Sequence, residues 1–295
     1  MLNVAIITLN WNRPADTLEF LESASRQTLK GSQLVVVDNG SSDDSINQFS
    51  THFPQAELLV NNANLGFARG MNTGIRQALN KGADYLFIAN NDTFLAPNLL
   101  ERLMDQAQQT RASIIAPVIF YASQPQQIWS AGAGRNPLTL EVIDSWRDQP
   151  GSSLGSTPYP VDFITACGML VERSCFEAVG LFDERFFMYY EDSDFSLRVR
   201  QSGRQILVDP LAHMWHKVAT SSGGSNAPSE RYWMARSSLI FFRKHAHPSQ
   251  WLIIGLFRMG SAIKTTLSLL SQGKTDALRA YWRGLRDGWK SEQNP

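Results

Sequence analysis

Acidic side chains that could do chemistry follow two apolar runs of the chain. Asp38 comes directly after the run Leu34–Val37, and Asp92 follows the run at 85–89. Open parallel sheets bind ligands beyond the carboxyl ends of their strands, so both carboxylates are expected where a ligand would be met. A carboxylate such as Asp92 suits Mg²⁺ or Mn²⁺ carrying phosphates. The structural alternative for both acids is a turn or a helix cap.

A third acidic group, at 191–194, precedes a predicted helix that stops at Gly203. Acids at a helix N-terminus are favoured by the helix dipole, so capping explains one of them, whereas three are present. The dipole would also keep Asp192 ionised, as a base that accepts a proton from a hydroxyl must be. His213 and His216 follow a predicted strand at Gln205–Val208 and are candidate metal ligands, although a lone histidine is more often structural.

The stretch 64–74 carries three glycines, Gly66, Gly70 and Gly74, at the start of a predicted helix. Backbone N–H groups and the positive dipole end could approach a nucleotide there. Tight helix packing explains the same glycines equally well. The spacing matches neither the dinucleotide fingerprint nor the P-loop.

The elements that must position these residues alternate along the chain. Buried strands are predicted at Val4–Thr8, at Leu34–Val37, at Leu58–Val60 and at 84–89, with helices between them. This alternation predicts an α/β fold with right-handed crossovers and a mostly parallel sheet. Residues 121–160 have little periodicity and read as a long functional or mobile loop. Three aromatic residues in it could stack on a ligand or pin the loop to the body: Trp129, Trp146 and Tyr159.

Composition indicates one catalytic domain with an appendage. Hydrophobic residues make up 43% of the 295-residue chain and charged residues 18%, which is typical of a globular protein with a sizeable core. Residues 228–295 hold 11 Lys/Arg against 4 Asp/Glu, whereas residues 1–227 hold 16 against 23. We therefore expect an acidic domain at 1–227 and a basic helical extension at 228–295. Nucleic acid is disfavoured as a partner, because the domain with the acidic candidates is itself acidic.

Two helices are predicted beyond Pro248, and tryptophans alternate with basic residues on the second. This pattern suits the surface of an anionic membrane; packing on the same chain or on a homodimer mate is the alternative. The most apolar stretch, 251–270, is interrupted by Arg258 and Lys264, so no membrane span is expected. No signal peptide is expected either, and two cysteines without a paired framework favour a reducing compartment. The expected location is the cytoplasm, with peripheral contact to the cytoplasmic face of the membrane.

Four motifs in order resemble family 2 glycosyltransferases, and most closely the rhamnosyltransferase-like members. They are residues 38–43 (DNGSSD), 64–72 (NLGFARGMN), 90–92 (NND) and 180–194 (GLFDERFFMYYEDSD). The likeness covers roughly residues 3 to 245. It implies a GT-A fold, a nucleotide-sugar donor, Mg²⁺ or Mn²⁺, and inversion at the anomeric carbon.

The resemblance also implies roles for individual residues. Asp192 would be the catalytic base, and Glu191 would orient acceptor or donor hydroxyls. Asp92 matches the last acid of the family's D-x-D motif and would bind the metal with His216, although Asn90 stands where the first acid is usual. Residues 219–226 read as a flexible loop that could close over the diphosphate. The donor-binding set is Thr8, Asn10, Asp38, Asn64, Gly66, Phe67, Gly70, Asn72, Asn91 and Arg236.

The activity implied is transfer of a sugar to a hydroxyl of a glycan or lipid-linked glycan, with dTDP-rhamnose favoured as donor. Two other classes remain open. A sugar nucleotidyltransferase shares a similar sheet but would want a glycine-rich basic loop after the first strand, where Asn10 to Arg13 contain no glycine. A catalytically silent nucleotide-sugar-binding partner protein is disfavoured by the intact acids and His216.

Overall fold

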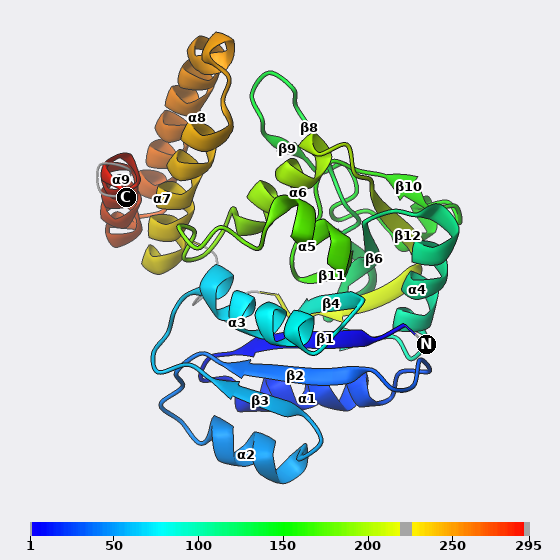
Figure 1. The fold of residues 1–295 in the computed structure, drawn as a ribbon. Helices are drawn as coiled ribbons and strands as arrows, with labels where there is room; N and C mark the ends of the chain where they lie inside the picture. Colours follow the sequence, from blue (N-terminus) through cyan, green and yellow to red (C-terminus); the bar gives the residue numbers. More distant parts are fainter. Residues whose placement is uncertain (1, 219–225, 292–295) are drawn as a thin grey trace. The chain divides into compact units, whose positions relative to one another are not determined.

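A computed structural model of the chain describes residues 2–218 and 226–291. The chain divides into two compact units (Figure 1). The first comprises residues 1–134, 144–183 and 192–218, and the second comprises 135–143, 184–191 and 219–295. The predicted boundary after residue 227 therefore falls inside the second unit, which also takes two short segments from the middle of the chain. Most of the predicted loop over the diphosphate, residues 219–225, lies outside the described residues.

The first unit is built on one mixed sheet. Strands β3, β2, β1 and β4 run parallel and in that order, as the alternation of strands and helices predicts. Strand β11 follows antiparallel, and then β6 and β12 run parallel to each other, with β10 at the edge. The strands of this order are β3 (Glu57–Val60), β2 (Gln33–Asp38), β1 (Val4–Asn10), β4 (Tyr85–Asn90), β11 (Gly168–Glu172), β6 (Ile114–Tyr121), β12 (Ile206–His216) and β10 (Tyr159–Pro160).

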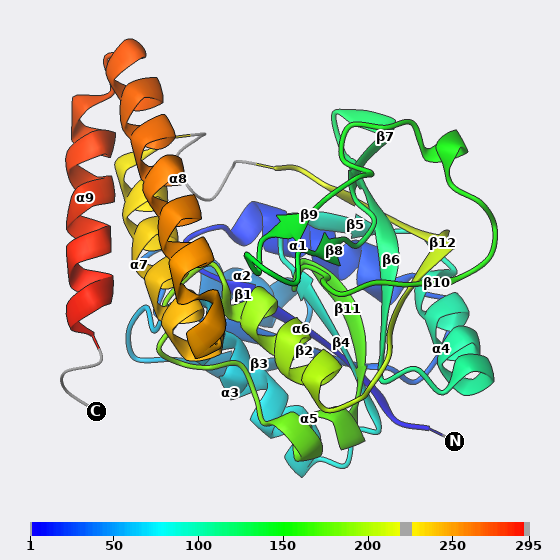
Figure 2. The ribbon, with the colours of Figure 1, turned by 90° about the horizontal axis from the view of Figure 1, so that it is seen from above.

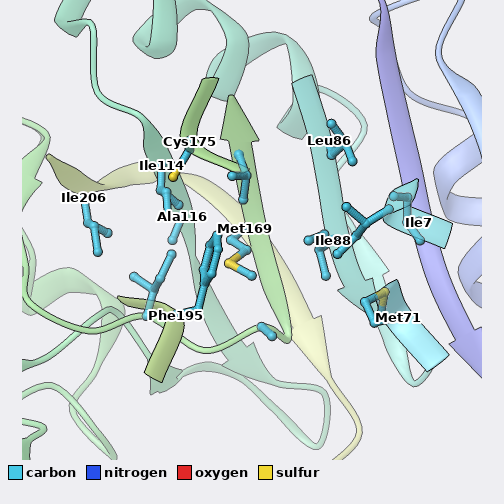
Figure 3. Close-up of a cluster of buried hydrophobic side chains, with 14 of the residues drawn as sticks. Ile7, Met71, Leu86, Ile88, Ile114, Ala116, Met169, Cys175, Phe195 and Ile206 are labelled. Carbon is cyan, nitrogen blue, oxygen red and sulfur yellow. The ribbon is translucent and has the colours of Figure 1, made fainter. Parts of the chain in front are cut away.

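Helices cover both faces of this sheet, because the strands are apolar on both sides. Along β1, Ala5 and Ile7 face one layer of helices while Val4 and Ile6 face the other. Figure 3 shows the first of these two cores, where Ile7, Met71 and Ile88 come together. Its helices are α3 (Phe67–Asn80), α5 (Arg173–Val179) and α6 (Glu191–Gln201); those of the other core are α1 (Pro14–Ser25), α2 (Ser45–His52) and α4 (Leu99–Thr110).

The predicted long loop at 121–160 contains regular structure. Strand β7 (Gln124–Ser130) folds back antiparallel on β6, and short pieces follow at β8 (Gly134–Arg135), β9 (Val142–Ile143) and Gly151–Ser153. Strand β7 is an edge strand rich in Gln and contains a proline, so its sequence reads as a loop. The strand expected at 205–208 is also longer than predicted. It runs on to His216 as β12, with a register shift between Asp209 and His213.

The second unit is helical, as predicted for the C-terminal extension. It contains α7 (Pro228–His245), α8 (Trp251–Ser271) and α9 (Thr275–Lys290), with a short 3₁₀ turn at Pro248–Gln250 (Figure 2). Helix α9 packs tightly on α7, because a Cβ atom at Gly284 would lie 2.3 Å from the carbonyl oxygen of Tyr232. Gly288, one turn later, approaches the carbonyl of Arg236 in the same way.

Candidate active site

Asp38 and Asn10 end two neighbouring parallel strands and are paired in register. Asn10 Nδ2 donates a hydrogen bond of 2.8 Å to Asp38 Oδ2, and the backbone N–H of Ser41 donates one of 2.9 Å to Oδ1. Both side chains are fully buried. A buried carboxylate needs such donors, because an unpaired one would be costly. The structure thus brings two of the predicted donor-binding residues together.

A hydrogen-bonded relay extends from this pair to the segment that holds Asp92. Thr17, on α1, donates its hydroxyl to Asn10 Oδ1 over 2.8 Å. Asn91 Nδ2 in turn donates to the Thr17 hydroxyl over 2.9 Å. Asp38 and Asn91 therefore belong to one network. Thr17 escapes prediction from sequence, because it lies near the start of α1 with no motif around it.

Thr8, also on β1, is 1% exposed. Its hydroxyl has no hydrogen-bond partner among the residues that the structure describes. A buried hydroxyl without a partner typically costs about 1–3 kcal/mol. A bound sugar nucleotide would supply a partner for this hydroxyl if Thr8 contacts it, as predicted. That contact stays a prediction.

The glycine-rich stretch is organised by Asn39, the residue after Asp38. Asn39 Nδ2 donates to Asn64 Oδ1 and to the carbonyl oxygen of Gly66, both over 3.1 Å. Asn64 Oδ1 also accepts from the backbone N–H of Gly66 over 2.9 Å. Gly66 has φ 81°, which only glycine adopts at low cost, and it precedes the first residue of α3. The start of α3 is thereby fixed beside the end of β2.

Three further residues on α3, each predicted to contact the sugar nucleotide, have roles in packing. A Cβ atom at Gly70 would lie 2.9 Å from Leu9 Cδ1 and 3.0 Å from Asn39 Oδ1, so a larger residue there would require these two side chains to shift. Phe67 lies with its ring centroid 6.2 Å from that of Phe182. The buried amide of Asn72 donates to the Phe182 carbonyl and accepts from the Phe182 N–H. Their contact with a nucleotide stays a prediction.

Asp92 and His216 meet at the end of β12. His216 pairs with Thr93 of strand β5 (Thr93–Leu95), and its Nε2 lies 3.1 Å from Asp92 Oδ1. Both side chains are buried. The backbone N–H of Lys217 donates to the Asp92 carbonyl, which fixes the two segments. Trp129 packs edge-on against the His216 ring, with centroids 4.4 Å apart, so it supports the imidazole from β7.

The buried thiol of Cys167 contacts the His216 ring and lies within the electrostatic influence of Asp92 and Asp192. Burial raises the pKa of Cys167, the His216 ring lowers it, and the charges of Asp92 and Asp192 each raise it. Burial alone would lower the pKa of His216, but contact with Cys167 and Asp92 raises it to about 10. Nothing in the sequence around Cys167 indicates this contact.

The acids at the start of α6 have different surroundings. Asp194 is fully buried and pairs with Arg198 Nε over 2.8 Å. Arg198 also donates to the carbonyl oxygens of Val179 and Leu181, which ties α6 to the turn after α5. Asp192 is half-buried, and its Oδ1 accepts from the Ser193 N–H over 2.7 Å. Asp194 is therefore a structural acid, whereas Asp192 is the half-buried acid whose charge raises the pKa of Cys167.

Two predicted site residues, Glu191 and Arg236, belong to the second unit. Within it, the Arg236 guanidinium donates to the carbonyl of Arg185 over 3.0 Å and lies over the ring of Trp233. Glu191 is buried. Their roles toward a donor or acceptor stay predictions.

Asp92 and His216 form a donor set that suits a divalent cation, because a carboxylate oxygen and an imidazole nitrogen are ligands that Mn²⁺ accepts. Within 2–218 and 226–291, no group of three His, Cys, Asp or Glu side chains is arranged to hold a metal. A cation there would take its remaining ligands from a bound diphosphate. The residues fit a metal that arrives with a nucleotide better than one held permanently.

Comparisons with known proteins show which sequences and which fold the chain resembles. The profile of glycosyl transferase family 2 matches residues 5–180. The N-acetylglucosaminyl-diphospho-decaprenol L-rhamnosyltransferase of Mycobacterium tuberculosis is 28% identical over 288 residues, covering 87% of this chain and 91% of its own. The dTDP-rhamnosyl transferase RfbF of Shigella flexneri is 24% identical over 295 residues, covering 97% and 95%.

Solved structures establish the fold. A crystal structure of GalNAc-T7 with UDP, GalNAc and Mn²⁺ superposes with a TM-score of 0.61 at 14% identity, covering 84% of this chain and 52% of that one. The structure of Staphylococcus aureus TarS gives a TM-score of 0.55 at 13% identity, covering 82% and 40%. The predicted GT-A fold is thereby confirmed.

Proposed function

The chain belongs to glycosyl transferase family 2, and from that premise we propose that it transfers rhamnose from dTDP-rhamnose to a hydroxyl of a glycan or lipid-linked glycan, with inversion. One observation carries the proposal: the buried side chains of Asp92 and His216 are in contact, with Nε2 3.1 Å from Oδ1. These two side chains would hold a cation that carries the donor diphosphate, and the negative charge of Asp192 reaches the same region, where it raises the pKa of Cys167.

Asp192 is the proposed catalytic base. Its carboxylate removes the proton from the acceptor hydroxyl, whose oxygen then attacks the anomeric carbon on the side opposite the departing nucleotide. Its place at the N-terminal end of α6 keeps it ionised, because the dipole favours negative charge there. General base catalysis of this kind contributes about 10²–10⁴-fold in rate. Glu191, the residue before it, is proposed to orient the reacting hydroxyls.

Asp92 and His216 are the proposed ligands of Mg²⁺ or Mn²⁺. When bound, the cation would neutralise charge on the leaving diphosphate. The Lys217 backbone and Trp129 hold these two side chains in contact, so the site needs little rearrangement to receive a donor. Such preorganised charge is usually the largest contribution to catalysis.

The nucleotide is proposed to lie along the carboxyl ends of β1 and β2. Asp38 would accept hydrogen bonds from the pyrimidine or ribose, with Thr8 and Asn10 beside it. The Thr17 relay supports this placement, because it joins Asp38 to Asn91 and so to the segment of the proposed metal ligand. The remaining proposed donor contacts are Asn64, Gly66, Phe67, Gly70, Asn72 and Arg236.

The choice of donor and acceptor rests on the relatives. Two of them carry rhamnosyltransferase names, one specifying dTDP and the other a diphospho-decaprenol acceptor. We propose the same donor here and an acceptor from cell-surface polysaccharide synthesis. We also propose a cytoplasmic location, because the two cysteines are free.

A panel of nucleotide sugars tests the proposal directly. The full chain is heated with each donor in the presence of Mn²⁺, and stabilisation follows donor affinity. dTDP-rhamnose should raise the melting temperature most and should then yield a rhamnosylated product with an N-acetylglucosaminyl lipid acceptor. A larger shift with UDP-hexoses would reject rhamnose. Formation of a nucleoside-diphosphate sugar and pyrophosphate from a nucleoside triphosphate and a sugar 1-phosphate would instead identify a nucleotidyltransferase.

A further inference from the structure

Helix α8 carries a stripe of large apolar residues that remain exposed in the part of the chain that the structure describes. Within 2–218 and 226–291 it is the one helix long and apolar enough to cross a membrane, and 11% of its most apolar window is buried. The stripe recurs every three or four residues, which places it on one face of the helix. We call these residues the α8 stripe, and they are 52–75% exposed: Leu252, Leu256, Met259, Ile263, Leu267 and Leu270.

The adjacent helix α9 presents a second exposed face of different chemistry. Its exposed residues also recur at helical spacing, and they include four cations and two tryptophans, together with one acid, Asp276, which pairs with Arg279 over 3.4 Å. Trp282 and Trp289 are 49% and 59% exposed. The opposite face of α9 is used for packing on α7, through Gly284 and Gly288. We call the exposed face the α9 basic face: Arg279, Trp282, Arg283, Arg286, Trp289 and Lys290.

The two helices are held beside each other within the second unit (Figure 2). Leu269 of α8 packs with Ala277 and Tyr281 of α9. The buried side of α8 is anchored by Arg258, which donates to Ser238 over 2.7 Å and lies 3.7 Å from Glu141. These contacts fix which side of α8 is left outside.

The charges of α8 oppose a spanning orientation. Lys264 is exposed near the middle of the helix, and Arg258 is engaged with α7. A charged side chain at the bilayer centre costs at least about 2.5 kcal/mol. A helix that lies in the interface plane keeps both charges at the headgroup level while its apolar face enters the acyl boundary.

We propose that the α8 stripe and the α9 basic face together form a docking surface for a bilayer that contains anionic phospholipids, with α8 lying in the plane of the interface. Apolar side chains supply burial, and the cations of α9 attract the negative surface. Tryptophans suit the interface between headgroups and acyl chains. The proposal uses no residue of the catalytic site and stands independently of the donor and acceptor proposed above.

A second copy of this chain is the competing occupant, since the α8 stripe has the spacing of a coiled-coil seam. It fits the observations less well. A symmetric contact through α9 would bring its four cations against their own copies, and a contact through α8 alone would leave the exposed tryptophans and cations of α9 without a function.

Vesicle sedimentation tests the docking surface. The full chain is mixed with vesicles of phosphatidylcholine alone or with added phosphatidylglycerol, and the bound fraction is measured. Binding should require phosphatidylglycerol and should fall at high salt. Leu256→Gln or Leu267→Gln should lower the partition coefficient about tenfold or more. Arg279→Gln with Lys290→Gln should lower it about fivefold for each charge. Leu2→Gln and Arg26→Gln, exposed in the first unit, are the matched controls and should bind normally.

Three results would overturn the proposal. Absence of binding to both kinds of vesicle would remove the lipid partner. Sedimentation velocity that shows a dimer dissociated by Leu256→Gln would assign the stripe to a second copy. Retention of the chain in the lipid pellet after carbonate extraction would replace docking with insertion. The vesicle experiments use no sugar donor. Failure of the transferase assay would therefore not change how the vesicle-binding results are interpreted.

Discussion

The Nε2 atom of His216 lies 3.1 Å from Oδ1 of Asp92, at the point where β12 and β5 pair. Both side chains are buried. This contact joins residues far apart in the sequence and brings the two proposed cation ligands together. The charge of the proposed base, Asp192, raises the pKa of Cys167, the thiol beside His216.

Asp92→Asn should weaken Mn²⁺-dependent binding of dTDP. Loss of an outer-shell partner of a metal ligand already costs 10–100-fold, so loss of a ligand should cost at least about tenfold. Calorimetric titration of dTDP with and without Mn²⁺ measures the effect. Asp44→Asn, an exposed acid after Asp38, is the control. Equal Mn²⁺ enhancement in wild type and Asp92→Asn would exclude Asp92 as a ligand.

Thr8→Val should raise the free energy of unfolding and should also lower the affinity for the nucleotide. The valine removes a buried hydroxyl without a partner among the described residues, which should raise the free energy of unfolding by about 1 kcal/mol. If Thr8 contacts the donor, the same change should lower nucleotide affinity. Urea denaturation and dTDP titration of one sample measure both. Unchanged affinity in a stabilised variant would remove Thr8 from the donor site.

Asp194→Ala should destabilise the chain by about 3 kcal/mol, because it leaves Arg198 partly buried without its carboxylate. Asp192→Asn, two residues away and half-buried, should change the free energy of unfolding by less than about 1 kcal/mol. Comparison of the two by urea denaturation separates the structural acid from the proposed base. A large loss of stability in Asp192→Asn would show that this residue also holds the fold.

Glu57 should make stability depend on pH. It ties β3 to Gln33 of β2, to Gln77 of α3 and to Lys81, which directly follows α3. Burial raises the pKa of Glu57, but the bonds from Lys81, Gln77 and Gln33 outweigh it and leave the pKa below its usual 4.5. The ionised form is therefore favoured by folding.

The resulting stabilisation is present above pH 4.5 and is lost as the pH falls through the folded-state pKa. Urea denaturation of wild type and Glu57→Gln should differ at neutral pH and converge in acid. A difference that stays constant with pH would assign the effect to packing.

The strand-end acids could be predicted because buried parallel strands have a clear apolar pattern. Asp38 and Asp92 follow such runs, and the polar relay from Asp38 to Asn91 lies where that pattern indicates. Thr17 and Cys167 could not be predicted, because their importance comes from contacts between distant segments. Neither has a motif around it that distinguishes it from an ordinary helix or strand residue.

Other features escaped prediction for different reasons. The edge strand β7 has too little periodicity to be recognised, yet it brings Trp129 against His216. The membership of 135–143 and 184–191 in the second unit depends on tertiary contacts alone, such as the hydrogen bond from Ser237 to the Met188 carbonyl. The sequence allowed two explanations for the glycines on α3, close approach of a ligand and tight helix packing. Gly70 packs closely against Leu9 and Asn39.

Transfer kinetics of Asp192→Asn test the central claim most directly, with dTDP affinity measured on the same preparation. An amide cannot accept the acceptor's proton, so kcat should fall by at least about 10²-fold while dTDP in the presence of Mn²⁺ binds as tightly as to wild type. Near wild-type turnover in a folded Asp192→Asn variant would contradict the assignment of Asp192 as the base.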